Sequence, residues 1–297
     1  MYIINNGDIM YIFYALLAAL TSGITTLFAK KSLNTNSNLV TFLRTIIIFL
    51  FTILVVLLFK VEFVKLDFKT SLFLILSGIF TALLWICYFK ALSLSSVNKV
   101  TPVDKTSIVL TLILSSIIFK EKITLYKIIS IVFMLVGTYL MVGRSDKKDN
   151  NKWLFYAVLT SIFNSIATII AKFGIKDVDA SYATFIRVFV VLICISLYIF
   201  IRKDYKDIKN IKKKDYLYIS LSGISTSLSW LFYFMALKLG DASLVFPIEK
   251  LSAAFAIMFS IIFLKEKMNN KMKIGFMLIL ISVLILIVNN ICICNVN

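Results

Sequence analysis

The sequence predicts an all-α polytopic membrane protein of ten transmembrane helices, arranged as two inverted five-helix repeats. Three observations lead to this prediction: a composition that is 60% hydrophobic and only 16% charged, ten apolar runs of membrane-spanning length, and a similarity between the two halves of the 297-residue chain. Soluble domains are typically about 45–50% apolar and about 25% charged. The composition therefore excludes an ordinary soluble fold, and its hydrophobicity excludes disorder.

The apolar runs define the expected helices. A helix that crosses a bilayer needs about 20 predominantly apolar residues. In chain order, the segments of this length are 9–29, 38–60, 70–91, 100–119, 124–143, 152–174, 182–201, 216–237, 243–264 and 271–292. The gaps between them are short and leave no room for a folded soluble domain, so we expect a multi-pass protein of the cell membrane.

The two halves of the chain match at a nearly constant spacing. Between residues 73 and 124, 21 of the 52 residues are identical to those 145 positions later. The most distinctive matches in the chain are Trp85 with Trp230, Pro102 with Pro247, Lys105 with Lys250, Arg44 with Arg187, Lys30 with Lys172, and the Lys-Glu-Lys runs at 120–122 and 265–267. Five spans per half is an odd number, so the second copy enters the membrane upside down, as in secondary transporters. We therefore expect one repeat over residues 1–148 and an inverted repeat over 149–297.

The charge balance excludes several other classes of protein. The chain has 32 basic and 15 acidic residues, a net charge of +17, but nearly all the basic residues lie between apolar runs, where they contact lipid headgroups. No histidine occurs, and the four cysteines lack metal-ligand spacing. We therefore expect no metal, no cofactor and no nucleic-acid partner. The expected partners are membrane lipid and a small-molecule substrate, bound by a monomer or homodimer.

Loop charge also bears on orientation. The loops at 144–152 and 202–215 are separated by an even number of spans, so they must lie on the same side of the membrane. Their many basic residues favour the cytoplasm under the positive-inside rule.

Two long stretches carry a resemblance to a known family. They read SGIFTALLWICYFKALSLSSVNKVTPVDKTS and SLSGISTSLSWLFYFMALKLGDASLVFPIEKLSAAF, and a Lys-Glu-Lys run follows each. They resemble the EamA-type family of the drug/metabolite transporter superfamily, as two copies that cover nearly the whole chain. The resemblance implies a ten-helix transporter with a central cavity lined mainly by the first, third, fourth, sixth, eighth and ninth spans. It also implies cytoplasmic termini, which opposes the loop charge, so both orientations stay open.

Two acids are the first candidates for function. Asp104 and Glu249 are the acids that fall inside predicted spans, and each lies two residues after a proline. Intramembrane charges are costly and usually functional. We predict that both acids bind a cationic group or exchange a proton, with Glu249 as the more important because its side chain is longer. A helical turn of about 100° per residue directs Lys105 and Lys250 away from them, toward a neighbouring helix or the interface.

The prolines themselves allow two interpretations. Pro102 and Pro247 either interrupt their helices beside a binding site or occupy the first turn of a helix, where proline is tolerated.

Further polar and aromatic residues share faces with these acids. Ser107 and Ser252 continue the polar stripes of the fourth and ninth spans. In the third and eighth spans, Trp85, Tyr88, Trp230 and Tyr233 form either a cavity wall or an interfacial belt.

Three further polar residues lie within spans. Asn164 serves either the substrate or an interhelical hydrogen bond. We expect Arg44 and Arg187 to extend toward the headgroups.

These features favour a secondary active transporter of a small polar metabolite, an amino acid or an organic cation. It would work by alternating access, with a proton gradient as one possible energy source, because no ATP-binding motif is present. The alternative is a flippase of a lipid-linked carrier, for which Arg44, Arg187, Lys105 and Lys250 are the candidate headgroup ligands. A membrane-embedded enzyme is disfavoured, because the chain lacks histidine and any metal cluster.

Overall fold

The computed structural model describes residues 6–120, 124–142, 151–174, 178–239, 245 and 248–294, and this part of the chain is helical without strands. The helices are α1 (Asn6–Ser32), α2 (Ser37–Leu58), α3 (Phe68–Leu94), α4 (Val97–Lys105), α5 (Ser107–Ile118), α6 (Leu125–Val142), α7 (Lys152–Gly174), α8 (Ala180–Arg202), the 3₁₀ helix η1 (Asp204–Asn210), α9 (Lys213–Leu239), α11 (Ser252–Phe263) and α12 (Asn270–Cys294).

Among the described residues, eight helical stretches are long and apolar enough to cross a membrane. The helices α4 and α5 together make one of them, Val97–Ile118. The shorter apolar helix α11 lies within the predicted ninth span, part of which is outside the described residues, and α12 covers the predicted tenth span. The protein is therefore an integral, multi-pass membrane protein.

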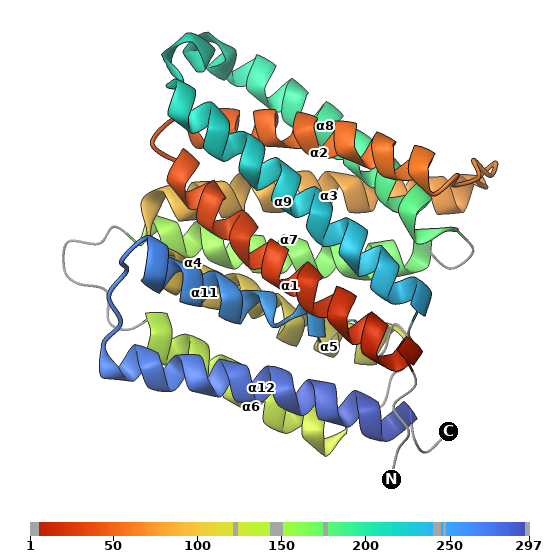
Figure 1. Ribbon diagram of the computed structural model, residues 1–297, viewed down its shortest axis with the longest axis vertical. Helices are drawn as coiled ribbons and strands as arrows, with labels where there is room; N and C mark the ends of the chain where they lie inside the picture. Colours follow the sequence, from red (N-terminus) through yellow and green to blue (C-terminus); the bar gives the residue numbers. More distant parts are fainter. Residues whose placement is uncertain are drawn as a thin grey trace.

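Helices from the two halves of the chain pack in pairs. The pairs α1 with α9 and α3 with α7 lie in the middle of the molecule, α2 with α8 lies at one edge, and α6 with α12 lies at the opposite edge (Figure 1). Each pair takes one helix from each half. A buried apolar cluster from α2, α3, α8 and α9 includes Leu39, Phe89, Ile195 and Ile219, so the hydrophobic core itself joins the two halves.

Local signals set the ends of the helices. The Asp67 carboxylate accepts a hydrogen bond from the backbone N–H of Thr70 and caps α3, and the hydrogen bonds from Thr70 hold the pKa of this carboxyl below its usual value. Lysines with positive φ follow the ends of α2, α5, α8 and α11. They are Lys60, Lys120, Lys203 and Lys265. A left-handed lysine is unusual, and Lys120 and Lys265 occupy equivalent positions of the two halves.

The contact between α6 and α12 depends on two glycines. A Cβ atom on Gly275 would lie only 2.6 Å from the carbonyl oxygen of Gly137. The hydroxyl groups of Ser130 and Ser282, 2.9 Å apart, hydrogen-bond across the same interface. Small residues let the two backbones approach closely in the membrane, where packing rather than hydrophobicity drives helix association.

One end of the bundle carries the two loops that we predicted to share a side. Leu33 packs against the cluster that contains Ile211, which follows η1. It also packs against the cluster that contains Trp153, near the start of α7. The residues that flank 144–152 and 202–215 therefore meet at the same end of the molecule, which we call the lysine-rich end.

Candidate functional site

The fourth span is broken next to its proline. Pro102 is the sixth residue of α4, so it does not occupy the first turn. At the break, the N–H of Thr106 donates to Val103 O at 3.1 Å instead of to Pro102 O. The freed carbonyl of Pro102 accepts a hydrogen bond from Thr138 Oγ1 at 3.3 Å.

The second half has a matching break before α11. The N–H of Leu251 donates to Ile248 O at 3.1 Å, and Leu251 stands 145 positions after Thr106. Its backbone angles, φ −60° and ψ −13°, are close to the −62° and −14° of Thr106. Pro247 itself lies outside the described residues.

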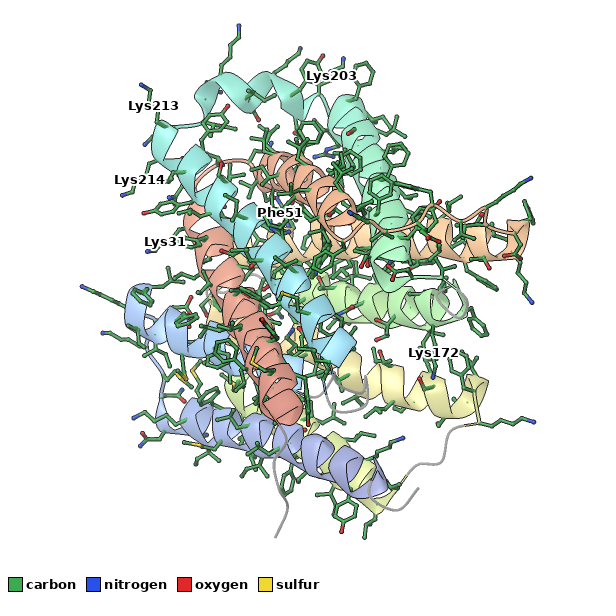
Figure 2. All side chains as sticks on the ribbon, turned by 45° about the vertical axis from the view of Figure 1, so that its right-hand side comes forward. Lys31, Phe51, Lys172, Lys203, Lys213 and Lys214 are labelled. Carbon is green, nitrogen blue, oxygen red and sulfur yellow. The ribbon has the colours of Figure 1, made fainter. Side chains whose placement is uncertain are left out.

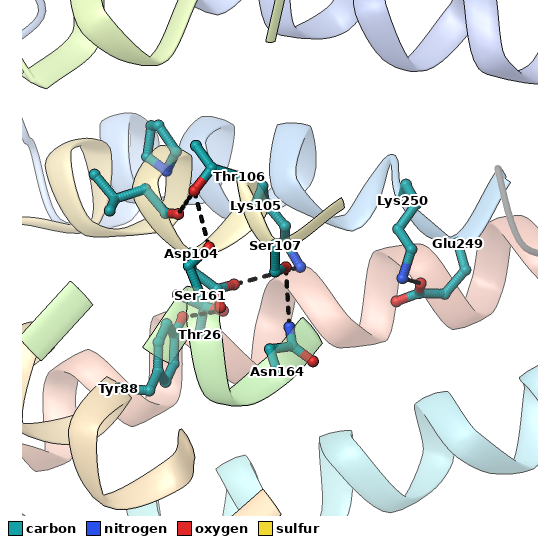
Figure 3. A network of polar contacts seen from close by, with 12 residues as sticks. Thr26, Tyr88, Asp104, Lys105, Thr106, Ser107, Ser161, Asn164, Glu249 and Lys250 are labelled. Atoms are coloured by element: carbon teal, nitrogen blue, oxygen red, sulfur yellow. Dashed lines mark hydrogen bonds and ion pairs between the residues drawn. The ribbon is translucent and has the colours of Figure 1, made fainter. Parts of the chain in front are cut away.

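Two ion pairs lie at these breaks (Figure 3). Lys105 Nζ is 3.7 Å from Asp104 Oδ2, and Lys250 Nζ is 2.9 Å from Glu249 Oε2. Asp104 is only 7% exposed. Each carboxylate is thus compensated by the lysine that follows it in the chain. We call these four residues the charge cluster.

The expectation that the two lysines point away from the acids was wrong. It assumed continuous helices that fix the rotation of every residue. Lys105 is instead the last residue of α4, and Lys250 stands directly before the second break. A long, flexible side chain at such a break can turn back to the neighbouring carboxylate.

Hydroxyl and amide groups of α7 surround the first break. Thr106 Oγ1 lies 2.9 Å from Ser161 Oγ, and Asn164 Nδ2 donates to Ser107 Oγ at 3.1 Å. Of the two roles considered for Asn164, the structure shows the interhelical hydrogen bond. Ser252, the counterpart of Ser107, is buried, and its hydroxyl has no hydrogen-bond partner among the described residues.

The aromatic residues lie between the two halves. Trp85 and Trp230 stack on each other with ring centroids 6.4 Å apart, which does not match an interfacial belt. The Tyr88 hydroxyl lies 3.3 Å from Thr26 Oγ1 of α1 (Figure 3). Tyr233 packs against a buried cluster of α1, α9 and the segment before α11. These rings therefore line the contact between the halves.

Arg44 is buried, so the expectation that it reaches the headgroups was wrong. It is 5% exposed, its Nε donates to Ser222 Oγ at 3.1 Å, and its Nη2 donates to Thr226 Oγ1 at 2.5 Å. The guanidinium also lies 5.1 Å from the ring centroid of Trp85 and 5.0 Å from that of Phe89. Hydroxyl groups and aromatic faces thus compensate a cation that has no carboxylate partner among the described residues.

Arg187 makes the equivalent contact in the other half. Its Nη2 donates to Thr81 Oγ1 at 3.2 Å, and Thr81 stands 145 positions before Thr226. Its Nε atom is buried and has no hydrogen-bond partner among the described residues. The expectation of a headgroup contact was therefore wrong here too, because a hydroxyl of the adjacent α3 lies within reach.

Sequence reasoning missed two residues that bind backbone groups at the lysine-rich end. Lys30 Nζ donates to the carbonyl oxygens of Leu92 and Ser95 at 2.5 and 2.6 Å. The Glu266 carboxylate accepts hydrogen bonds from Val97 N and Asn98 N at 2.8 and 2.9 Å.

Together these two side chains satisfy backbone groups at the end of α3 and the start of α4. The signal was present in the matches of Lys30 with Lys172 and of the two Lys-Glu-Lys runs. These matches indicated an internal repeat, but they did not indicate that Lys30 and Glu266 bind backbone groups at the helix ends.

A small cavity of about 10 Å³, room for roughly one water molecule, lies beside Trp230, between α2, α8 and α9. Its lining residues are Phe51, Thr52, Val55, Ser181, Thr184, Ser227 and Trp230. Through Trp230 it touches the aromatic contact between the halves.

Comparison with known proteins gives a consistent result. The model of the EamA-like transporter family matches residues 9–143 and 151–288. An uncharacterized transporter of a Sinorhizobium species is 37% identical over 120 residues, which is 40% of this chain and 85% of the relative. An uncharacterized transporter of Archaeoglobus fulgidus is 28% identical over 225 residues, 75% of this chain and 78% of the relative.

A solved crystal structure resembles this protein in fold, with a TM-score of 0.65. The likeness covers 93% of this chain and 95% of that one at 16% sequence identity.

Proposed function

Since this chain belongs to the EamA-like transporter family and is a multi-pass membrane protein, we propose that it is a secondary active transporter of the cell membrane. The proposed substrate is a small polar metabolite, an amino acid or an organic cation. The proposed mechanism is alternating access between two inverted five-helix repeats, 1–148 and 149–297, with ten spans in total.

The observation that supports this proposal best is the symmetry of contacts between the halves. Arg44 of the first half bonds to Thr226 of the second, and Arg187 of the second bonds to Thr81 of the first. Two halves that can exchange equivalent contacts can also exchange conformations, which is the basis of alternating access in inverted-repeat transporters.

The contacts of Lys30 and Glu266 provide a candidate gate. Glu266 belongs to the second half, and the two N–H groups that it binds belong to the first. We propose that these hydrogen bonds keep the lysine-rich end closed and break when that end opens to release or admit substrate.

The charge cluster is the proposed site of coupling. Asp104 is buried and its lysine is 3.7 Å away, whereas Glu249 is paired at 2.9 Å. A proton or a cationic substrate can replace the lysine as the partner of a carboxylate more easily when the lysine is farther from that carboxylate. In place of the expectation that Glu249 is the more important acid, we therefore propose Asp104 as the principal exchanging group. We propose Trp85, Tyr88, Trp230 and Tyr233, at the contact between the halves, as the substrate-facing aromatic residues.

Transport by the purified protein in liposomes tests this proposal. Amino acids, organic amines and a lipid-linked sugar are supplied separately across a series of external pH values. We expect uptake of a soluble substrate whose rate depends on pH, and we expect Asp104→Asn to lose that dependence. Glu62→Gln, which changes an exposed loop carboxylate, is the matched control. An unchanged rate and pH profile for Asp104→Asn would return both intramembrane acids to a structural role.

The lipid-linked carrier alternative has lost its main support. It relied on four basic residues as headgroup ligands. In the structure all four have partners within the protein, in two ion pairs and two interhelical hydrogen-bonded contacts, and the Lys250 side chain is 36% exposed. Movement of the lipid-linked sugar alone in the liposome experiment would restore this alternative.

A further inference from the structure

A surface cavity of about 450 Å³ opens at the lysine-rich end, away from the charge cluster. It lies between the end of α1, the start of α9 and the end of α11. Its lining residues are Lys30, Lys31, Asn34, Lys214, Asp215, Tyr218, Leu264 and Glu266.

Some of the charged groups of this cavity already have partners. Lys30 binds the carbonyl groups at the end of α3, and Glu266 binds the N–H groups at the start of α4. Asp215 is buried in the first turn of α9, where a carboxylate is stabilised by the positive end of the helix dipole. Lys30 and Glu266 are therefore already engaged, whereas Asp215 adds one buried negative charge to the wall of the cavity.

The two lysines of the cavity that have not yet been assigned a partner are Lys31 and Lys214. Their ammonium groups lie 5.6 and 5.9 Å from the centroid of the same Tyr218 ring. Neither forms an ion pair with a carboxylate among the described residues. Figure 2 shows both lysines, together with Lys213, on the same side of the molecule. Two like charges gathered around one ring repel each other, and a bound anion would relieve this repulsion.

Exposed apolar side chains stand next to residues of the cavity lining in the chain, before Tyr218 in α9 and before Leu264 at the end of α11. Lys31 Nζ also lies 6.0 Å from the ring centroid of Phe263. Phe263 and Ile262 of α11 are 54% and 61% exposed, and Leu217 of α9 is 56% exposed. In a membrane-spanning bundle, such a surface contacts acyl chains. A cationic pocket that continues into this surface matches a molecule with an anionic head and an apolar tail.

We propose that the cavity between α1, α9 and α11 binds the phosphate-bearing headgroup of an anionic phospholipid, held by Lys31 and Lys214 next to the Tyr218 ring. The acyl chains lie along Phe263, Ile262 and Leu217. This site is independent of the transported substrate. Because α1 belongs to the first half and α9 and α11 to the second, the bound lipid joins the two halves at their closed end.

Native mass spectrometry of the delipidated protein in detergent tests this site. The probes are dioleoylphosphatidylglycerol, dioleoylphosphatidylcholine and soluble glycerol phosphate. We expect phosphatidylglycerol to bind the native protein most tightly. The double variant Lys31→Gln/Lys214→Gln should lose about tenfold or more in affinity, since each lysine near an anionic headgroup contributes on the order of 1 kcal/mol.

Two further variants make the result specific. Lys31→Arg/Lys214→Arg keeps both charges and should retain most of the affinity. Lys206→Gln/Lys209→Gln removes two exposed charges from η1 at the same end of the molecule, and it should leave the affinity unchanged. Melting temperatures measured without added lipid establish that each variant is folded.

Several outcomes would overturn the proposal. An equal loss of affinity in the two Gln double variants would reduce the effect to diffuse electrostatic attraction. Equal binding of phosphatidylcholine would remove the requirement for net negative charge. Saturation of the cavity by glycerol phosphate without binding of phosphatidylglycerol would assign it to a soluble phosphate ester instead of a lipid.

Discussion

At the scale of single residues, the membrane interior requires every buried polar group to find a partner. Arg44 meets this requirement with two hydroxyl groups and two aromatic faces. Arg187 has one hydrogen bond and a buried Nε without a partner in the described part of the chain. The two arginines are equivalent in sequence but are not equally satisfied by hydrogen bonds.

This difference predicts unequal effects of removing the two hydroxyl acceptors. Thr226→Val leaves the Nη2 of Arg44 without an acceptor and should lower the free energy of unfolding by about 1–2 kcal/mol. Thr81→Val, its matched counterpart, should cost less because the bond to Arg187 is longer, 3.2 Å against 2.5 Å. Unfolding in mixed micelles measures both values. A larger loss for Thr81→Val would contradict this account of the arginines.

At the scale of helices, the breaks at Thr106 and Leu251 place charged residues where a continuous helix would not. The proline removes one backbone donor, the next turn tightens, and a carbonyl becomes free for Thr138. The peripheral pair α6 and α12 is instead continuous and tightly packed. The fold therefore combines interrupted central helices with rigid outer ones.

The glycine contact of the outer pair gives a prediction at this scale. Gly275→Ala introduces a Cβ atom 2.6 Å from Gly137 O, and a backbone carbonyl cannot move away as a side chain could. We expect a loss of stability of about 1–3 kcal/mol, seen as a lower melting temperature. Met277→Ala, at a position 58% exposed on the same helix, is the control and should change little. Equal melting temperatures for both variants would show that α6 and α12 can separate freely.

At the scale of the whole molecule, the helix pairing determines which loops share a side of the membrane. The flanks of 144–152 and 202–215 meet at the lysine-rich end, whereas the connection between α2 and α3 lies at the opposite end. The same end contains the proposed gate and the proposed lipid site. Its position relative to the cytoplasm therefore determines which leaflet supplies the lipid.

Cysteine labelling from one side of the membrane tests this arrangement in a background without the four native cysteines. Lys152→Cys and Lys206→Cys should react with a membrane-impermeant reagent from the same side, and Lys65→Cys should react only from the other. The side on which Lys206→Cys reacts also decides between the loop-charge and the family-based orientation. Reaction of Lys152→Cys and Lys206→Cys from opposite sides would exclude the ten-span inverted repeat.

The sequence by itself determined the membrane class, the positions of the eight spans found among the described residues and the membership of the family. These properties depend on local hydrophobicity and on self-similarity, which can be read along the chain. Only the tertiary structure decided where the polar groups find their partners. Arg44 bonds to Thr226, 182 residues away, and Lys105 turns back to Asp104 at a helix break. Such contacts depend on how the helices cross and on where they are interrupted. The residues of a single span do not determine either property, because both depend on packing against other helices.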